Sequence, residues 1–285
     1  MKNLLYLILT VFIVSCGSDK KTSDLANENK KNDLTEANLK GKVKSIKETT
    51  FSAVEKFGKP TNDQQTGLSY TTYNKKGNGV EKSTYKSDGS LIYNVTNTYD
   101  DKGNKIEMNV YKSDGSLDFK ATYKCDDKGN ILEWNKYKSD GSLDYKSTYK
   151  YDEKGNRIER NKYKSDGSLI SKTTLKYDDK GTNIESIRHD SDGSLDYKAT
   201  YKYDDKGNKI ERIGYDSDGS LDSKYIFKYD DKGNMIEWNR YSTDGSLNWE
   251  NSYTYEYDKN GNWISKTEFK DSTPTEIMER EIEYY

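Results

Sequence analysis

Apolar and polar residues alternate along most of this chain, from about Leu39 to the C-terminal end. The alternating segments are eight to ten residues long, rich in Tyr, Ile, Thr and Trp, and separated by short turns that contain glycine. A period of two is typical of β-strands that bury one face. Only two prolines occur in 285 residues, so few positions interrupt strand pairing. The pattern therefore predicts a continuous antiparallel meander built from hairpins.

Two series of glycines give the chain a repeat. One series has a spacing of 26 residues until a last step of 28, and the other has a constant spacing of 26. The first comprises Gly77, Gly103, Gly129, Gly155, Gly181, Gly207, Gly233 and Gly261, and the second comprises Gly89, Gly115, Gly141, Gly167, Gly193, Gly219 and Gly245. A fixed period of this size marks a repeat architecture. Each unit has one turn like Asp-Asp-Lys-Gly-Asn and one like Ser-Asp-Gly-Ser, and therefore two strands.

The hydrophobic pattern also indicates a register within one repeat. A two-residue Asp-Gly turn at residues 114–115 places Val110 opposite Phe119, and Lys112 opposite Leu117. Under this register one face is apolar and the other is polar, whereas a three-residue turn with a glycine bulge would mix the faces. We therefore predict the two-residue turn. The register at the Asp-Asp-Lys-Gly-Asn turns stays open.

The low apolar content of one unit predicts the fold class. A single hairpin is marginal in water, so the repeats must bury their apolar faces by stacking on their neighbours. We expect an all-β fold, an elongated antiparallel β-meander of 26-residue two-strand repeats that is twisted or curled into an open coil or shell. The apolar face lies inside, and no interior pocket is left for chemistry.

The two ends of the meander are predicted to be caps. Residues 39–76 form N-terminal capping strands, with strands at 43–50 and 68–74 around a long loop. Residues 263–285 form C-terminal capping strands, and their last segment, TEIMEREIEYY, is rich in Glu and Arg. Charge of this density discourages pairing with the edge of another chain.

The N-terminal residues predict where in the cell the protein is located. Residues 4–14 are an apolar run that is too short to span a bilayer but typical of a signal peptide, and we assign residues 1–15 to a lipoprotein signal peptide. The sequence IVSC that ends at Cys16 resembles a bacterial lipobox, and this resemblance implies cleavage before Cys16 and lipid on that cysteine. Residues 16–38 are polar and are expected to form a flexible tether.

The predicted anchor and the net charge limit the classes of partner that we expect. Acyl chains on Cys16 would hold the protein to the cell outer membrane, on the periplasmic face or at the cell surface, with the repeats at residues 77–262 beyond the tether. The formal net charge is −2 with 34% charged residues. Because no basic field results, we expect no nucleic-acid partner. The membrane contact is then through lipid alone, and we expect a monomer.

The turn segments YDDKGNKIE, YDEKGNRIE and YDKNGNWIS resemble the Tyr-Asp-x-x-Gly-[Asn/Arg] motif of YD repeats, also called RHS-type repeats. The resemblance covers residues 68–269, and the style of the whole chain is similar to small YD-repeat lipoproteins of Gram-negative bacteria. It implies strands that spiral into an open shell or coil, with binding, adhesion or encapsulation roles. The period here is longer than is usual for YD repeats, which speaks against a closed shell. The Tyr-x-x-x-Gly spacing also resembles variant MORN repeats of antitoxin-like proteins.

Aromatic residues supply the candidate binding surface. On the polar face one repeat position is tyrosine in most units, and successive members lie two strands, or about 9–10 Å, apart. Such a row can stack sugar rings or hold an extended partner, so we predict a ligand-binding row at Tyr85, Tyr111, Tyr137, Tyr163, Tyr215 and Tyr241. The alternative is that lysine stems cover these rings and the row serves packing alone. Trp134, Trp238 and Trp249 fall on the inner face and are expected to be core.

Other chemically capable residues fit the repeat better than a site. The acidic Ser-Asp-Gly turns have too few carboxylates for calcium, so we expect hairpin corners and no metal. His189, the single histidine, occupies a slot that is tyrosine in other repeats. The recurring glutamates, such as Glu107 and Glu133, are typical of a solvated strand face. We expect no cofactor and no enzymatic activity.

These observations favour a non-enzymatic, lipid-anchored envelope protein that presents an extended surface for glycan or protein binding or adhesion. Two alternatives stay open. One is a structural spacer or shell segment with no specific ligand, and the other is an antitoxin-like partner of a secreted toxin.

Overall fold

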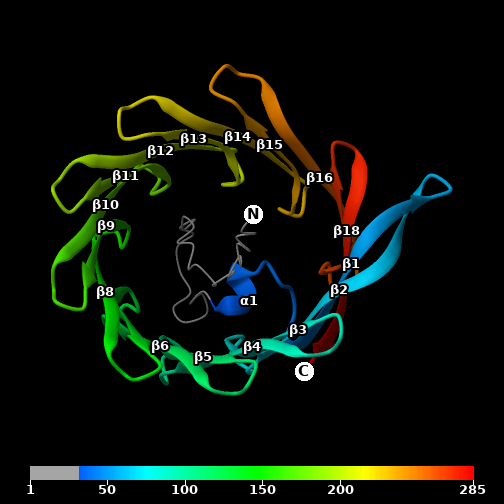
Figure 1. The fold of residues 1–285 in the computed structure, drawn as a ribbon, viewed down its shortest axis with the longest axis horizontal. Helices are drawn as coiled ribbons and strands as arrows, with labels where there is room; N and C mark the ends of the chain where they lie inside the picture. The colour runs from blue at the N-terminus through cyan, green and yellow to red at the C-terminus, as the bar shows by residue number, and fades with distance from the viewer. Residues whose placement is uncertain (1–31) are drawn as a thin grey trace, which may run out of the picture.

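The computed structural model describes residues 32–285, which form a short helix and 18 strands in a single antiparallel sheet. Each strand pairs with the next along the chain, and viewed down the shortest axis the strands form a ring (Figure 1). The elements are α1 (Asp33–Glu36), β1 (Val43–Lys56), β2 (Lys59–Tyr73), β3 (Gly79–Lys86), β4 (Leu91–Tyr99), β5 (Lys105–Lys112), β6 (Leu117–Cys125), β7 (Ile131–Lys138), β8 (Leu143–Tyr151), β9 (Arg157–Lys164), β10 (Leu169–Tyr177), β11 (Asn183–Asp190), β12 (Leu195–Tyr203), β13 (Lys209–Tyr215), β14 (Leu221–Tyr229), β15 (Met235–Tyr241), β16 (Leu247–Tyr257), β17 (Trp263–Lys270) and β18 (Thr273–Tyr284).

The sheet is a closed barrel, so the predicted open coil or shell is wrong. β1 pairs with β2 on one side and with β18 on the other, which makes a seam between the first and last strands (Figure 1). The seam runs from Val43 opposite Tyr284 to Ser52 opposite Glu276. Eighteen is an even number of strands, which lets an antiparallel meander close on itself. The terminal strands that the sequence analysis treats as caps are the two that complete the ring.

Complementary charges face each other across the seam. Lys47 Nζ lies 2.7 Å from Glu281 Oε1, on side chains that are 36% and 75% exposed. Arg280 Nε lies 2.9 Å from Glu48 Oε2, and this pair is less exposed, at 19% and 25%. The charges of β18 that would deter a foreign strand therefore match the chain's own first strand.

The Ser-Asp-Gly turns are three-residue turns with a glycine bulge, so the predicted two-residue turn is wrong. After β5, the Lys112 N–H donates to the Ser116 carbonyl at 2.8 Å, and the Gly115 N–H donates to the Lys112 carbonyl at 3.0 Å. Gly115 has φ +80°, a left-handed conformation that favours glycine. Asp114 Oδ1 accepts from the backbone N–H and the hydroxyl of Ser116 at 2.8 and 2.5 Å. The repeated acidic turn is a hairpin corner whose carboxylate bonds within the turn.

A second bulge restores the faces that the hydrophobic pattern requires. Leu117 pairs with Tyr111 and not with the predicted Lys112, but the next pair is Val110 with Phe119, so one residue between Leu117 and Phe119 is extra. The predicted pairing in the middle of the hairpin is therefore confirmed, although the turn is not. The apolar and polar faces fix the pairing in the middle of the strands. They do not fix the length of the turn, because the second bulge reverses the shift that the first bulge introduces.

The Tyr-Asp turns, which follow β4, β8, β10, β12, β14 and β16, are fastened by their own motif residues. In the turn after β8, Asn156 donates from its backbone N–H and Nδ2 to Asp152 at 2.7 and 2.9 Å. The preceding Tyr151 hydroxyl donates to the Ile131 carbonyl at 2.9 Å, at the start of the neighbouring strand. Tyr177 makes the equivalent bond one repeat later. These Tyr, Asp and Asn side chains therefore tie turns and strands together.

The long loop predicted between the first two strands is wrong, because it is a ribbon that projects from the ring (Figure 1). β1 ends at Lys56 and β2 begins at Lys59, so the turn is Phe57 and Gly58, with φ +53° and +72°. The Phe57 side chain is fully exposed. Within residues 53–62 the two strands pair with each other beyond the end of the seam. The segment has no buried face, which is why its sequence lacks the alternation that predicts a strand.

A short segment before β1 lies inside the ring (Figure 1). Asp33 Oδ2 accepts hydrogen bonds from the Tyr99 hydroxyl at 2.5 Å and from the Gly79 N–H at 2.6 Å. The segment contributes to a cluster of buried residues, Leu34, Leu39, Val43, Ile46 and Tyr73. Residues 32–38, the end of the predicted tether, are thus folded against the barrel. The predicted signal peptide, the lipidated Cys16 and the rest of the tether lie outside the described residues.

Successive residues of each strand face the inside and the outside of the ring in turn. Tyr99, which contacts α1, shares its face with Val95, and Val95 pairs with Val110. The face that was predicted to be apolar is therefore the inner wall. On β5 and β6 it has a small core of Met108, Val110 and Ala121.

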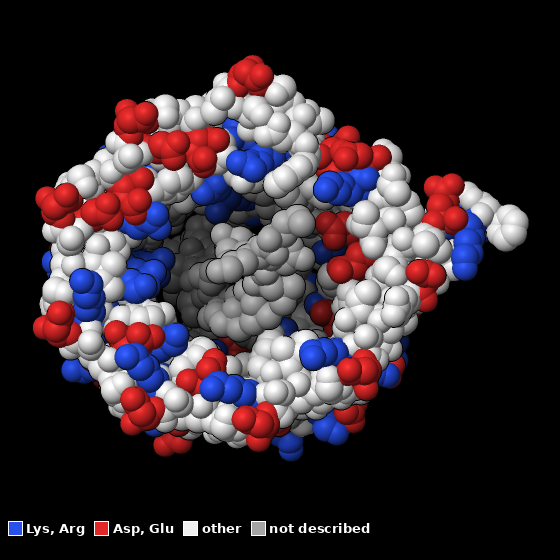
Figure 2. All heavy atoms as spheres, viewed as in Figure 1, with Lys and Arg blue, Asp and Glu red and all other residues white. Residues whose placement is uncertain are grey.

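The outer wall has rungs of opposite charge between neighbouring strands. Glu159 Oε1 and Oε2 each lie 2.8 Å from a lysine Nζ, of Lys150 and Lys172 respectively. These two lysines lower the pKa of Glu159 to about 2. Lys120 with Glu107 and Lys146 with Glu133 repeat the arrangement. In Figure 2 side chains of both signs surround the ring. Within residues 32–285, no helix is long and apolar enough to cross a membrane.

Candidate binding surface on the inner wall

The inner wall becomes basic on the side of the ring opposite the seam. Positions that are apolar on β5 are occupied by arginine and lysine on β9, β11, β13 and β15. We call these residues the basic row: Arg160, Lys162, Arg188, Arg212 and Arg240. In Figure 2 Lys and Arg side chains gather on the left and upper inner wall and face the opening. The hollow of the barrel therefore has a cationic wall.

Strand register places the arginines of the basic row in two pairs. Arg160 and Arg188 both pair with Thr173 of β10, so they lie on the same rung with one strand between them. Arg212 and Arg240 likewise both pair with Tyr225 of β14. Residues on alternate strands are about 9–10 Å apart. One arginine thus lies on every second strand, and the second pair is displaced along the strands from the first, because Arg188 is opposite Tyr197 and Arg212 is opposite Tyr201 of β12.

Aromatic rings on β12, β14 and β16 stack with Arg212 and Arg240. The Arg212 guanidinium carbon lies 5.5 Å from the Tyr197 ring centre and 5.3 Å from that of Tyr225. The Arg240 guanidinium lies 5.9 Å from the Tyr225 ring centre and 5.3 Å from that of Trp249. Arg212 Nη2 also donates to the Tyr197 hydroxyl. Contacts at these distances hold the guanidinium groups in fixed positions without neutralising them.

A hollow of about 330 Å³ opens between β9 and β12. It is lined by Arg160, Lys162, Ile170, Ser171, Thr173, Arg188, Asp190 and Asp196. Arg160 donates to Ser147 Oγ from Nε at 3.3 Å and from Nη2 at 3.2 Å, while Arg188 pairs with Asp196. Lys162 Nζ lies 4.1 Å from the Tyr145 ring centre. Burial, and then the charge of Arg160, lower the pKa of Lys162.

Most of the basic row lacks a carboxylate partner. Among residues 32–285, no ion pair involves Arg160, Lys162, Arg212 or Arg240, and Arg188 alone of the row has one. The Nε of Arg240 is buried without a hydrogen-bond acceptor in the described part of the chain. The inner wall can therefore bind negatively charged or hydroxyl-rich groups.

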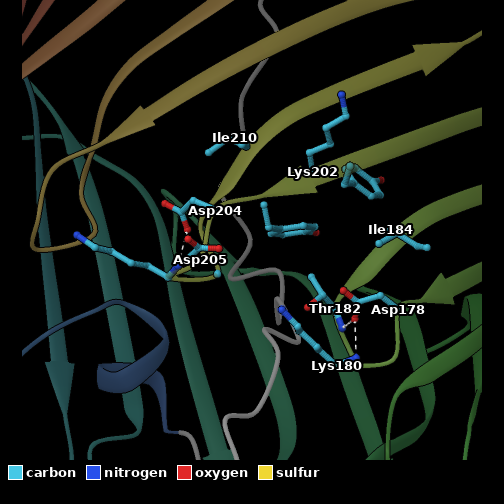
Figure 3. A pocket seen from close by; sticks show the side chains of 12 residues that line it. Asp178, Lys180, Thr182, Ile184, Lys202, Asp204, Asp205 and Ile210 are labelled. Atoms are coloured by element: carbon cyan, nitrogen blue, oxygen red, sulfur yellow. Dashed lines mark hydrogen bonds between the residues drawn. The ribbon is translucent and has the colours of Figure 1, made fainter.

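A second hollow, of about 930 Å³, lies between two Tyr-Asp turns (Figure 3). Ile184, Ile210 and Tyr201 contribute apolar lining. Two of its acidic residues, Asp178 and Asp204, are engaged within their turns: Asp178 Oδ1 accepts from the backbone N–H groups of Lys180 and Thr182, at 3.0 and 2.8 Å (Figure 3). This hollow therefore offers apolar contact area beside the basic row, and the carboxylate of Asp178 is occupied by its own turn.

The wall near the seam has the opposite character. Glu268 of β17 and Glu276 of β18 are directly opposite each other. Burial, and then the neighbouring Glu268, raise the pKa of Glu276. Lys266 Nζ lies 4.1 Å from the Tyr253 ring centre, and burial lowers the pKa of Lys266. A polyanion inside the barrel would therefore be directed away from the seam and toward the basic row.

The tyrosine row predicted to bind ligand lies on the outer wall. Tyr85, Tyr111, Tyr137, Tyr163, Tyr215 and Tyr241 are each partly buried and each pairs with the leucine that begins the next strand. On its other side Tyr215 pairs with Lys198, whose Nζ is 6.0 Å from the ring centre. The structure does not bring these tyrosines together in a pocket. Leucine and lysine flank Tyr215, as the packing alternative expects.

The other predicted sites are also placed. His189 is partly buried between Lys172 and Leu195 on neighbouring strands. Trp134 packs against the inner core of β5 and β6, and Trp238 Nε1 donates to the Tyr253 hydroxyl at 2.8 Å. Trp249 was also expected to be core, but it is 44% exposed, beside Arg240. The prediction of no interior pocket is wrong, because the barrel wall encloses the two hollows.

The basic row was missed because the faces were worked out on one repeat. In residues 105–125 the inner positions are Met108 and Val110, and the same positions 52 residues later are Arg160 and Lys162. Comparison of each inner position across all repeats would have shown that apolar residues give way to basic ones. The change from apolar to basic residues is visible in the sequence at these inner positions, although the turns that define the repeat do not change with it.

Comparisons with known proteins do not define a family. No family model matches the chain, and no curated protein matches it. Among solved structures, a porin-like protein from Bacteroides uniformis is 14% identical, with 85% of this chain and 98% of that chain covered and a TM-score of 0.45. A porin-like protein from Bacteroides vulgatus is 12% identical with the same coverage and a TM-score of 0.38. The Photorhabdus luminescens Tc holotoxin pore is 14% identical, with 79% of this chain and 14% of that chain covered, and a TM-score of 0.30. Similarity at this level defines no function.

Proposed function

We propose that this protein is a non-enzymatic envelope protein that holds an extended glycan or protein ligand against the inner wall of its barrel. The observation that supports the proposal most directly is the basic row, in which guanidinium groups alternate with aromatic rings from β12 to β16. A surface on which charged and aromatic groups recur on alternate strands suits an extended polymer with repeating units. The binding surface thus replaces the outer tyrosine row as the principal candidate.

The proposed address follows the sequence. A lipid on Cys16 would anchor the protein to the outer membrane, with the charged rungs of the outer wall in contact with water. The resemblance to YD-repeat lipoproteins belongs to the same proposal and supports a binding or adhesion role. The structural spacer and the antitoxin-like partner are the alternatives that the experiment must separate.

The test compares one tyrosine side chain on the inner wall with one on the outer wall. The purified full chain is screened on a glycan array and in a pull-down from envelope extract, together with Tyr225→Ala on the inner wall and Tyr163→Ala on the outer wall. Loss of an aromatic platform costs about 1–3 kcal/mol, so Tyr225→Ala should bind about five- to 150-fold more weakly. Tyr163→Ala should bind as the parent does. Circular dichroism establishes that both variants are folded.

Three other outcomes reject the proposal. A loss with Tyr163→Ala alone would return the site to the outer row. No ligand from either screen, with intact protein, would favour the spacer. Capture of a toxin that both variants still bind would favour the antitoxin-like partner, which the gene neighbourhood would then support.

A further inference from the structure

We infer that the ligand of the inner wall is an acidic polysaccharide, and that the hollow at Arg160, Lys162 and Arg188 receives one of its carboxylate or sulfate groups. This inference rests on the binding role proposed above and names the class of ligand. Three basic and two acidic residues line the hollow, so one positive charge is in excess there. Of the three basic residues in the hollow, Arg188 alone is paired with a carboxylate of the described chain.

The hollow has the chemistry of an oxyanion site. Arg160 and Lys162 are close enough for the charge of Arg160 to lower the pKa of Lys162, and an anion between them would relieve that repulsion. Ser171 and Thr173 add hydroxyl donors to the lining. Guanidinium and ammonium donors form their strongest hydrogen bonds with charged oxygens. A carboxylate or sulfate therefore fits the site better than a neutral hydroxyl.

The spacing of the row favours a sparse polyanion. Arg160 and Arg188 are separated by one strand, as are Arg212 and Arg240, which corresponds to about 9–10 Å within each pair. Nucleic acid has one charge about every 3.4 Å along each duplex strand, a density that the row does not match. A polysaccharide with an acid on alternate sugars spreads its charge more widely. Its uncharged rings would then lie on Tyr197, Tyr225 and Trp249.

Charge also argues against the chain's own N-terminal segment as the occupant. Residues 17–31 contain three acidic residues and four lysines, for a net charge of +1. A segment of that sign gains nothing from a cationic wall. The acidic pair at Glu268 and Glu276 lies on the opposite side of the ring, so an external polyanion is attracted to one wall and repelled by the other.

The test measures binding of the full chain to four probes by calorimetry: hyaluronate, which has a carboxylate on alternate sugars, polygalacturonate, neutral dextran and a single-stranded DNA oligomer. The inner-wall variant is the double substitution Arg160→Gln and Lys162→Gln. The matched control is Lys150→Gln with Lys176→Gln, which removes the same charge from the outer wall. In that control Glu159 and Glu185 each retain a second lysine, Lys172 and Lys198.

We expect at least one acidic polysaccharide to bind at least tenfold more tightly than neutral dextran, with an affinity that falls as salt is added. The inner-wall variant should lose at least tenfold, and the control should stay within about twofold. Equal binding of neutral dextran, still lost with Tyr225→Ala, would overturn the acidic ligand and leave the proposed function intact. Tighter binding of DNA, or equal losses in variant and control, would also overturn it. Binding of no probe, together with no ligand in the earlier screens, would reject the proposed function itself.

Discussion

Gly214 shows how one small residue shapes the inner wall. A Cβ built at this position would overlap the Tyr197 hydroxyl and lie 3.1 Å from Ser223 Oγ. The equivalent residue four repeats earlier is Val110, which is buried in the core of β5 and β6. The missing side chain leaves room for the Tyr197 hydroxyl to accept from Arg212. Gly214 is therefore part of the structure that positions the basic row.

Replacement of Gly214 by alanine should act against the usual trend. Gly→Ala inside a strand ordinarily raises the free energy of unfolding by about 0.5–1 kcal/mol. Here the methyl group displaces Tyr197, so we expect a decrease of about 1–3 kcal/mol in urea denaturation. Gly67→Ala in β2 is the control, because its nearest atom would be 3.8 Å away, and it should show the ordinary gain. A gain at both positions would mean that the close contact at Gly214 is not important.

At the level of elements, the seam between β1 and β18 decides the architecture. Arg280 is enclosed by the wall: its guanidinium carbon lies 3.2 Å from the Trp263 ring centre, and its Nε donates to Glu48. Burial lowers the pKa of Arg280, and the charge of Glu48 opposes that effect. A charge in this position needs its carboxylate, because an unpaired partly buried cation is costly.

Glu48→Gln should weaken the seam while leaving the hairpins intact. We expect a loss of about 2 kcal/mol or more in the free energy of unfolding, with faster hydrogen exchange in β1 and β18 than in β5 to β12. Lys47→Gln at the same seam is the control, since its pair is exposed to water, and its effect should lie within the error of the measurement. Equal exchange rates in all strands of Glu48→Gln would show that the seam is not a separate unit of stability.

The elements differ in how far the sequence predicts them. The hairpins follow from contacts within about 26 residues, so the strands, the period and the pairing of Val110 with Phe119 are predictable. The seam joins Glu48 to Arg280, 232 residues apart, and no local pattern indicates that pairing. The basic row lies between these cases. Its residues are visible in the sequence, but its spacing depends on bulges in each hairpin that shift neighbouring strands.

At the scale of the whole molecule, closure requires an even number of strands, so the barrel can gain or lose whole two-strand repeats and still close. Each repeat adds two strands, one in each direction, so the first and last strands remain antiparallel whatever the number of repeats. Barrel diameter grows roughly in proportion to strand number. The same turn motif ends each repeat. If one repeat is deleted, its two neighbours are therefore connected by an equivalent turn.

Deletion of one whole repeat should therefore leave a smaller closed barrel. Removal of residues 131–156 joins Asn130 to Arg157 and leaves 16 strands. We expect a folded monomer with a ring diameter smaller by about a tenth, measured by small-angle X-ray scattering. Removal of residues 131–142 is the control, because it leaves 17 strands and the meander cannot close antiparallel. A stable closed monomer from the control would show that strand parity does not govern the fold.

The distance along the chain between the two seam strands also has a kinetic consequence. Closing a loop of 232 residues costs about 2–3 kcal/mol more in chain entropy than closing a hairpin such as that of Glu107 and Lys120, which are 13 residues apart. The hairpins should therefore zip up in succession soon after the chain leaves its unfolded state, and the ring should shut last. During that interval the open sheet has two bare edges, which is the stage at which the newly made protein is most exposed to strand exchange with its neighbours.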